Sequence, residues 1–126
     1  MDTLKITKAD LNERNEYAVA DSLEFRGSVE VEANLGVVRI RGRAIVVGAL
    51  SVNAGSSLEV GGSLKVGLSI TAKWISCEFR IFAGLCDWKI PSPEEMRINA
   101  EVRKGIVCFG EVMKPEITTK KKVADA

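Results

Sequence analysis

A six-residue repeat runs through the middle of the chain and restricts the folds open to it. Glycine recurs at this spacing in two runs, at Gly36, Gly42 and Gly48 and at Gly55, Gly61 and Gly67. Short apolar alternations, such as Val38/Ile40 and Leu64/Val66, lie between the glycines. The first apolar residue of each pair recurs in three blocks of three, Leu23/Val29/Leu35, Val38/Ala44/Leu50 and Leu58/Leu64/Ile70.

Alternation with a period of two indicates a strand with one buried face. Strands of this length are not stable alone, and a glycine after each pair lets the backbone bend sharply. The repeat therefore predicts a chain that coils, with each short strand stacked on the equivalent strand of the preceding turn. We expect an all-β protein, a short parallel β-helix with sides of roughly six residues and a turn of about 18 residues.

The competing fold is an antiparallel barrel or sandwich, which also uses short alternating strands. Such folds favour a strand spacing of about 8–12 residues and Asn-Gly or Asp-Gly hairpins. The spacing here is tighter and both dipeptides are absent, which favours the β-helix. The handedness of the coil stays open.

The ends of the chain differ from the repeat. Residues 1–22 form an N-terminal cap or arm, in which Leu4 and Ile6 fit a strand and residues 10–17 fit a turn of helix. The repeat covers residues 23–82. After Trp74 the alternation changes phase, which predicts a bulge or corner near Ile75.

We expect residues 83–113 to cap the C-terminal end of the coil. Ser92, Pro93 and Glu95 form a helix start, so a short helix is predicted to end near Asn99. A last strand follows at residues 106–110, and Trp88 and Phe109 are expected to pack over the open edge. Residues 114–126 are expected to be a mobile tail.

The chain contains no histidine, which excludes Ser-His-Asp and Cys-His chemistry and imidazole metal sites. The three cysteines, Cys77, Cys86 and Cys108, lie among apolar residues, so we expect small buried hydrophobes rather than disulfides, a catalytic thiol or zinc ligands. Chemistry based on carboxylates such as Glu78 and Asp87 stays formally open. We expect no enzyme, no cofactor and no metal site.

Arg39, Arg41 and Arg43 alternate with buried positions and are expected to project outward in a row. Such a row can bind phosphates or carboxylates through bidentate hydrogen bonds. The simpler interpretation is a set of ion pairs with acidic residues on adjacent turns, such as Glu59 or Asp21.

Two further groups are candidate binding residues. Glu24, Glu30 and Glu32 are expected to form an acidic patch, which either mimics phosphates or is only a solvated face. Trp74 and Trp88 belong to an aromatic group in the C-terminal third, which fits an interface or a core equally well.

Charge is unevenly distributed along the chain. Residues 1–36 carry a net charge of −4, residues 37–91 carry +4 and the remainder carries +1. This distribution permits head-to-tail association, although a mixed solvated surface explains it as well. The lysine run at residues 120–122 is too narrow for a nucleic-acid footprint, so we expect no direct nucleic-acid binding.

No apolar run approaches the roughly 20 residues that span a bilayer, and the N-terminus lacks the features of a secretory signal. We therefore expect a cytoplasmic protein with no membrane partner.

A family resemblance is carried by the run Leu58-Glu-Val-Gly-Gly-Ser-Leu-Lys-Val-Gly-Leu-Ser-Ile70. It resembles the repeats of bactofilin-like, polymer-forming β-helix proteins and of small β-helix proteins of bacteriophages and mobile elements. The likeness covers about residues 23–82. It implies end-to-end assembly without nucleotide, but residues 82–112 depart from the pattern and are expected to obstruct stacking.

The first functional hypothesis is a non-enzymatic protein-binding module, in its specific form a phage-encoded inhibitor of a host defence nuclease such as a CRISPR effector. The small size, the expected caps and the segregated charge motivate it. The alternative is a structural, self-assembling protein of bactofilin-like type, which forms a homo-oligomer.

Overall fold

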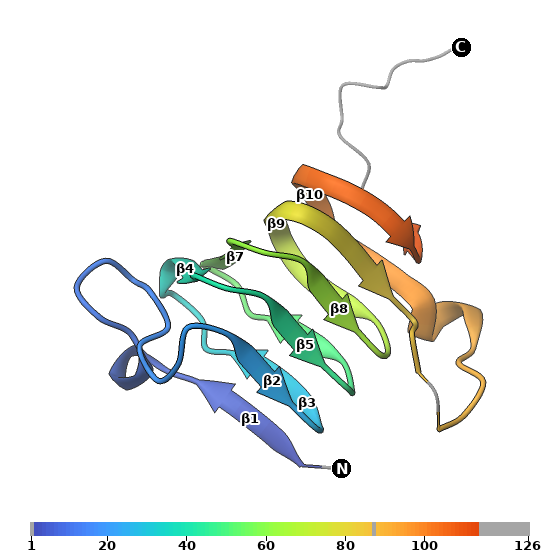
Figure 1. Cartoon of the computed structure of the whole chain (residues 1–126), viewed down its shortest axis with the longest axis horizontal. Coiled ribbons are helices and arrows are strands. Elements are labelled where there is room, and N and C mark those ends of the chain that lie inside the picture. The colour runs from blue at the N-terminus through green and yellow to red at the C-terminus, as the bar shows by residue number, and fades with distance from the viewer. Residues whose placement is uncertain (1, 87, 114–126) are drawn as a thin grey trace.

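The structure is a computed structural model that describes residues 2–86 and 88–113 (Figure 1). Eleven strands form one sheet, and the described residues contain two short 3-10 turns but no α-helix. The elements are β1 (Thr3–Ile6), η1 (Lys8–Asp10), β2 (Leu23–Phe25), β3 (Ser28–Val31), β4 (Gly36–Ile40), β5 (Ala44–Val46), β6 (Leu50–Val52), β7 (Ser56–Val60), β8 (Leu64–Val66), β9 (Ile70–Ala83), η2 (Pro93–Met96), β10 (Arg97–Phe109) and β11 (Glu111–Val112).

Every pairing between these strands is parallel, and the strands form three rows along the sheet. The first row is β1, β3, β6, the start of β9, the start of β10 and β11. The second is β4, β7 and the middle of β9 and β10. The third is β2, β5, β8 and the end of β9 and β10. The all-β class and the parallel pairing predicted from the repeat are confirmed.

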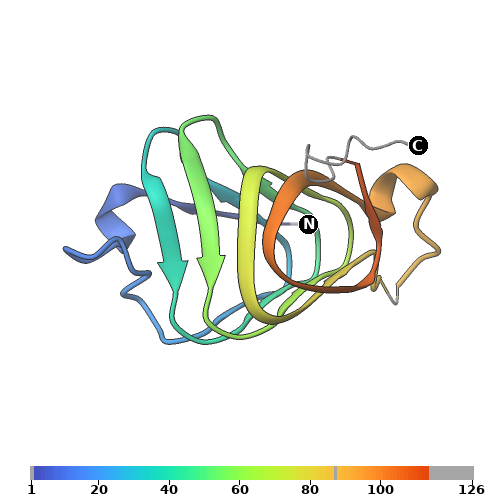
Figure 2. The same cartoon turned by 90° about the horizontal axis from the view of Figure 1, so that it is seen from above.

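The chain visits the three rows in turn, so it winds around a common interior (Figure 2). In the third row, paired residues lie 21 residues apart for Leu23 and Ala44, 20 for Ala44 and Leu64, and 17 for Leu64 and Ile81. The turn therefore shortens along the chain, and its length lies on both sides of the expected 18 residues. β9 and β10 run through all three rows as single strands. The predicted irregularity near Ile75 is the corner at which β9 leaves β6 and joins β7.

The core consists of the inward-facing residue of each alternation. Fully buried side chains include Val38, Leu58 and Ile75 in one row of contacts. Polar residues occupy the intervening outward positions, as expected for short strands with one buried face. Two inward series become smaller towards the C-terminal end, Ile40, Val60, Cys77 and Gly105, and Val46, Val66, Ala83 and Gly110. The interior therefore narrows in that direction.

Glycine is required where the corners of successive turns touch. A Cβ atom at Gly67 would collide with the carbonyl oxygen of Val47, and one at Gly61 would collide with that of Arg41. Each carbonyl belongs to the preceding turn of the chain. At Gly61 and Gly67 the glycine thus reflects close backbone contact at the corners. Gly36 instead has a left-handed backbone, with φ of 76°.

The C-terminal segment differs from the expected cap. The predicted helix is the 3-10 turn η2, and β10 begins directly after it at Arg97. The predicted capping interaction at the start of this turn is present, because the Ser92 amide donates to Glu95 Oε1 at 3.0 Å. The strand expected at residues 106–110 is the end of β10, which pairs in parallel with β9 and so continues the sheet.

The N-terminal segment contributes to the sheet as well, since β1 pairs with β3. The helical turn expected at residues 10–17 is wrong. Only Lys8–Asp10 forms a 3-10 turn, and Leu11 then makes an antiparallel bridge to Tyr17. The side chain of Asn15 donates to the carbonyl oxygens of Leu35 and Val37, at 2.6 and 3.2 Å, and so attaches this segment to β4. The predicted tail at residues 114–126 lies outside the described residues.

Candidate functional site

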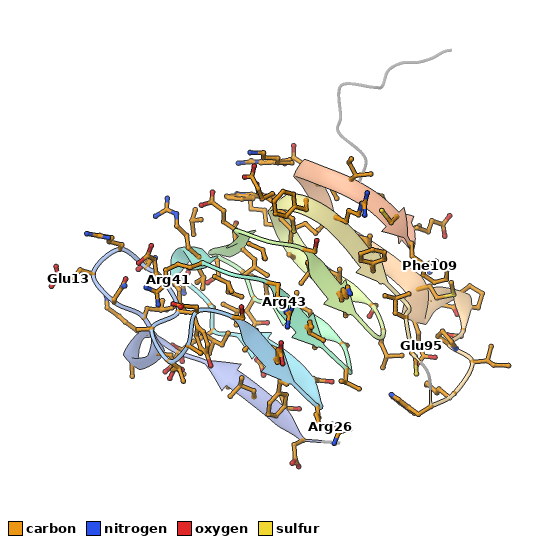
Figure 3. All side chains as sticks on the ribbon, viewed as in Figure 1. Glu13, Arg26, Arg41, Arg43, Glu95 and Phe109 are labelled. Atoms are coloured by element: carbon orange, nitrogen blue, oxygen red, sulfur yellow. The ribbon has the colours of Figure 1, made fainter. Side chains whose placement is uncertain are left out.

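The three arginines predicted to form a row are separated by a corner. β4 ends at Ile40, so Arg39 lies on the strand, whereas Arg41 and Arg43 lie in the connection to β5 (Figure 3). All three side chains are exposed, as expected, but they do not follow a single strand. Figure 3 labels Arg41 and Arg43, which lie apart across this corner.

Each arginine is paired with an acidic residue of a neighbouring turn. Arg39 Nε lies 2.9 Å from Glu59 Oε1, and Arg41 lies 2.8 Å from Asp21. Arg43 lies 3.0 Å from Glu24. The ion-pair interpretation named these same partners, Glu59 and Asp21, and it is confirmed. Since all these pairs are solvent-exposed, each adds only about 0–1 kcal/mol to stability.

The predicted acidic patch is divided between two sides of the coil. Glu24 lies on β2, in the third row, and contacts Arg43. Glu30 lies on β3, in the first row, and accepts a hydrogen bond of 2.8 Å from Asn53 Nδ2. Glu32 follows β3 and is half-buried. Because the charges belong to different rows, they do not form one face that mimics phosphates.

A shallow charged hollow of about 350 Å³ lies over the second row of strands. Gly61 and Ser76 are the small residues of its lining. Charges of both signs surround them and balance one another, Glu16, Arg39, Arg41, Glu59, Glu78 and Lys104. Glu78 is paired with Lys104 at 3.0 Å, and its suggested carboxylate partner, Asp87, lies outside the described residues.

The three cysteines have different environments. Cys77 is buried in the core as expected, and desolvation raises the pKa of its thiol to about 12. Cys86 is only half-buried and Cys108 is exposed, so the expectation of burial is wrong for Cys108. Within residues 2–86 and 88–113 no cluster of three or more cysteine or acidic side chains is placed to hold a metal ion.

The two tryptophans lie in different places. Trp74 is a half-buried residue of β9, and the guanidinium of Arg103 stacks over its ring at 4.5 Å from the centroid. Trp88 lies in the connection after β9 with 48% of its surface exposed, so it does not cover the core as expected. Lys89 Nζ lies 5.4 Å from the Trp88 ring centroid.

The connection that carries Trp88 is held by an ion pair. Lys89 Nζ lies 2.6 Å from Glu95 Oε2. Two hydrogen bonds lower the pKa of Glu95, the larger effect coming from Lys89 and the smaller from the Ser92 amide. This ion pair links Lys89, the residue after Trp88, to Glu95 in η2.

Beside Trp88 the surface has an apolar hollow of about 200 Å³, which we call the Trp88 hollow. It is lined by Ile45, Val46, Val47, Lys65, Val66, Gly67, Leu85, Cys86 and Trp88. Ile45 occupies an outward position of β5, where the adjacent strands carry Glu24 and Lys65. An apolar residue thus replaces a charged one on the outside of the coil.

The Trp88 hollow was not predicted from the sequence, although the sequence contains one feature that indicates it. The alternation breaks in the run Ile45-Val46-Val47, where three apolar residues follow one another. In a strand with one buried face, such a run must place at least one apolar side chain outward. Leu85 and Trp88 join the lining of the hollow only because the connection after β9 folds back onto the sheet, which the local sequence does not show.

Apolar exposure is concentrated in the part of the chain from Phe79 onward. Of the eight large apolar side chains that the structure describes as exposed, only Val19 lies before it. The others are Phe79, Leu85, Trp88, Ile90, Ile106, Phe109 and Met113. Phe79 and Ile106 line a second hollow together with Arg80 and Gly105. Leu85 and Trp88 therefore lie at one hollow and Phe79 and Ile106 at another, so the exposed apolar surface is divided between two places.

Comparisons with protein-family models, with curated proteins and with solved structures find no match to this chain. None of the helical turns in the described part of the chain is long and apolar enough to cross a membrane.

Proposed function

We propose that the chain is a non-enzymatic protein-binding module built on a short parallel β-helix, in which the paired residues of β2, β5, β8 and β9 lie 17 to 21 residues apart. The three rows of parallel strands support the β-helix assignment, since paired residues recur once per turn in each row. We also propose a cytoplasmic location, which rests on the sequence alone.

The Trp88 hollow is the observation that carries the binding function. It is apolar, lies on the outer surface of the coil and has the volume of one large side chain. Tryptophan at the edge of an apolar pocket is typical of the residues that dominate binding energy at protein interfaces. The hollow therefore suits a partner that inserts an aromatic or aliphatic side chain.

The specific form of this proposal is an inhibitor that binds a host defence nuclease. The exposed arginines and glutamates neutralise one another across turns, so charge mimicry gives it no support. Contact through the Trp88 hollow and the neighbouring Ile90, which is 95% exposed, is the form that the geometry favours.

The test is a binding assay of the immobilised full chain against purified nucleoprotein nucleases, with CRISPR effector complexes first. In the tested variant, Trp88→Ala is combined with Leu85→Ser. A hot-spot loss of about 2 kcal/mol weakens binding roughly thirtyfold. Val19→Ser is the control because Val19 is also an exposed apolar residue, at 64% against 48% for Trp88, but lies in the N-terminal arm. Failure to bind any complex, or equal binding by the double variant, contradicts the proposal.

A self-assembling structural protein is the second candidate. It is favoured by β10, which continues the parallel sheet over residues that were expected to obstruct stacking. A mass that grows without limit with concentration, measured by light scattering during size-exclusion chromatography, supports this candidate.

A further inference from the structure

The C-terminal end of the coil presents a long, unfinished strand edge. β11 pairs only with Arg97 and Ile98, at the beginning of β10. Over the rest of β10, residues 99–109, no other strand of the described chain pairs with the outer edge. A row of unpaired amide and carbonyl groups of this length is a template for pairing with another chain.

The interior is open to solvent at the same end. Val102 and Val107 face inward on β10 but are only half-buried, whereas their partners on β9, Ile75 and Ile81, have no exposed surface. Ile106, which is 67% exposed, and Phe109 add apolar surface on the same strand. Covering this end therefore buries apolar area as well as satisfying main-chain hydrogen bonds.

The N-terminal end is different. Its edge strands are short, with four residues in β1 and three in β2. The inward side chains of its first turn, Ile6, Tyr17 and Leu23, are buried. Short edge strands and a covered interior are features that prevent edge-to-edge association.

We infer that the C-terminal end pairs with the C-terminal end of a second copy of this chain, which gives a closed dimer. Two identical edges related by a two-fold axis pair reciprocally, because each supplies the same donors and acceptors. The charges of β10 and β11 nearly balance, Glu101 and Glu111 against Arg97, Arg103 and Lys104, so two copies of this end repel each other only weakly. Only one end has these features, which limits the assembly to two chains. This inference narrows the self-assembly candidate to one end and does not involve the Trp88 hollow.

The first measurement is the mass of the full chain by light scattering during size-exclusion chromatography, from about 1 to 100 µM. We expect the mass to approach twice the 13.7 kDa of one chain and to stop there. Unlimited growth overturns the inference and supports head-to-tail filaments. A monomer at every concentration also overturns the inference, whatever covers the outer edge of β10. That result does not affect the proposal that a partner binds at the Trp88 hollow.

The matched variants are Ile106→Glu and Val19→Glu, which place the same charge at positions of similar exposure, 67% and 64%, at opposite ends of the coil. Ile106→Glu is expected to raise the dimer dissociation constant at least tenfold, and Val19→Glu to leave it unchanged. Phe109→Glu serves if Ile106→Glu does not fold.

Hydrogen exchange provides a second readout that needs no substitution. Amides of residues 99–109 are expected to become more protected as the concentration of the full chain rises, while those of β1 do not change. Concentration-independent exchange in β10, or added protection in β1, contradicts pairing between C-terminal ends.

Discussion

Single residues at the corners of the coil have little tolerance for change, and Gly67 illustrates why. The position of its missing Cβ coincides with the Val47 carbonyl of the preceding turn. A side chain there must push apart two backbones that also share a hydrogen bond from the Gly67 amide to the Val46 carbonyl, at 2.8 Å. At Gly67, as at Gly61, glycine is thus required by contact between turns.

We expect Gly67→Ala to destabilise the protein by about 1–3 kcal/mol, because the backbone must shift to relieve the overlap. The free energy of unfolding in urea measures this. Ser51→Ala, an exposed change on β6, is the control and should alter stability by less than about 0.5 kcal/mol. Equal stability of Gly67→Ala and wild type would show that the corners are loose.

Cys77 makes the free energy of unfolding depend on pH. Burial raises the pKa of its thiol from the ordinary 9.0 to about 12, so the native state keeps the proton while the unfolded chain releases it. The contribution is complete below pH 9 and is lost as the pH rises towards 12.

Between pH 9 and 11, wild-type stability should therefore fall more steeply than that of Cys77→Val, by up to about 1 kcal/mol per pH unit. Urea titrations at three pH values measure the difference. The thiol of exposed Cys108 should also react with a thiol reagent at pH 8 much faster than that of Cys77. Parallel pH profiles for the two proteins would contradict the assigned burial.

At the scale of elements, the N-terminal arm is attached to β4 by backbone hydrogen bonds from Tyr17 N to Arg39 O and from Arg39 N to Asn15 O, at 2.7 and 2.8 Å, and by the side chain of Asn15. Asn15 has a left-handed backbone, with φ of 59°, and donates to two β4-side carbonyls. Asparagine tolerates this conformation better than most residues and supplies the amide that satisfies both acceptors.

Asn15→Ala is expected to loosen the arm and to reduce stability by about 1–3 kcal/mol, since it strains the backbone and leaves two acceptors unsatisfied. Hydrogen exchange should become faster in residues 8–17 and remain unchanged in β9. Glu13→Ala, at an exposed position of the same arm, is the control. Unchanged exchange in the arm would mean that its backbone hydrogen bonds to Arg39 hold it without the Asn15 side chain.

At the scale of the whole molecule, stability should vary along the coil. The middle turns are covered by neighbours on both sides, whereas the first and last turns are covered on one side only. Stacked repeats gain stability chiefly from their interfaces with adjacent repeats. We expect the slowest hydrogen exchange in β6 to β9 and faster exchange in β1 and β11 for the protein at low concentration. Uniform protection from end to end would indicate all-or-none opening.

The sequence by itself determined the local features of this protein. Alternation within each short strand decides which side chains face inward, and glycine spacing places the corners, so the all-β class and parallel stacking followed from residues such as Val38, Ile40 and Gly61. The ion pairs Arg39–Glu59 and Arg41–Asp21 followed too, because stacking brings residues about one turn apart together.

Only the tertiary structure decided where distant segments meet. The Trp88 hollow joins Ile45 and Leu85, which are far apart in the sequence, and it forms because the connection after β9 folds back onto β5 and β8. The C-terminal segment gives a favourable local helix signal at Ser92 and Glu95, yet pairing with β9 extends residues from Arg97 into a strand. In β10, hydrogen bonds to β9 replace the local hydrogen bonds of a helix. A local sequence pattern does not show which of the two sets of bonds is more stable.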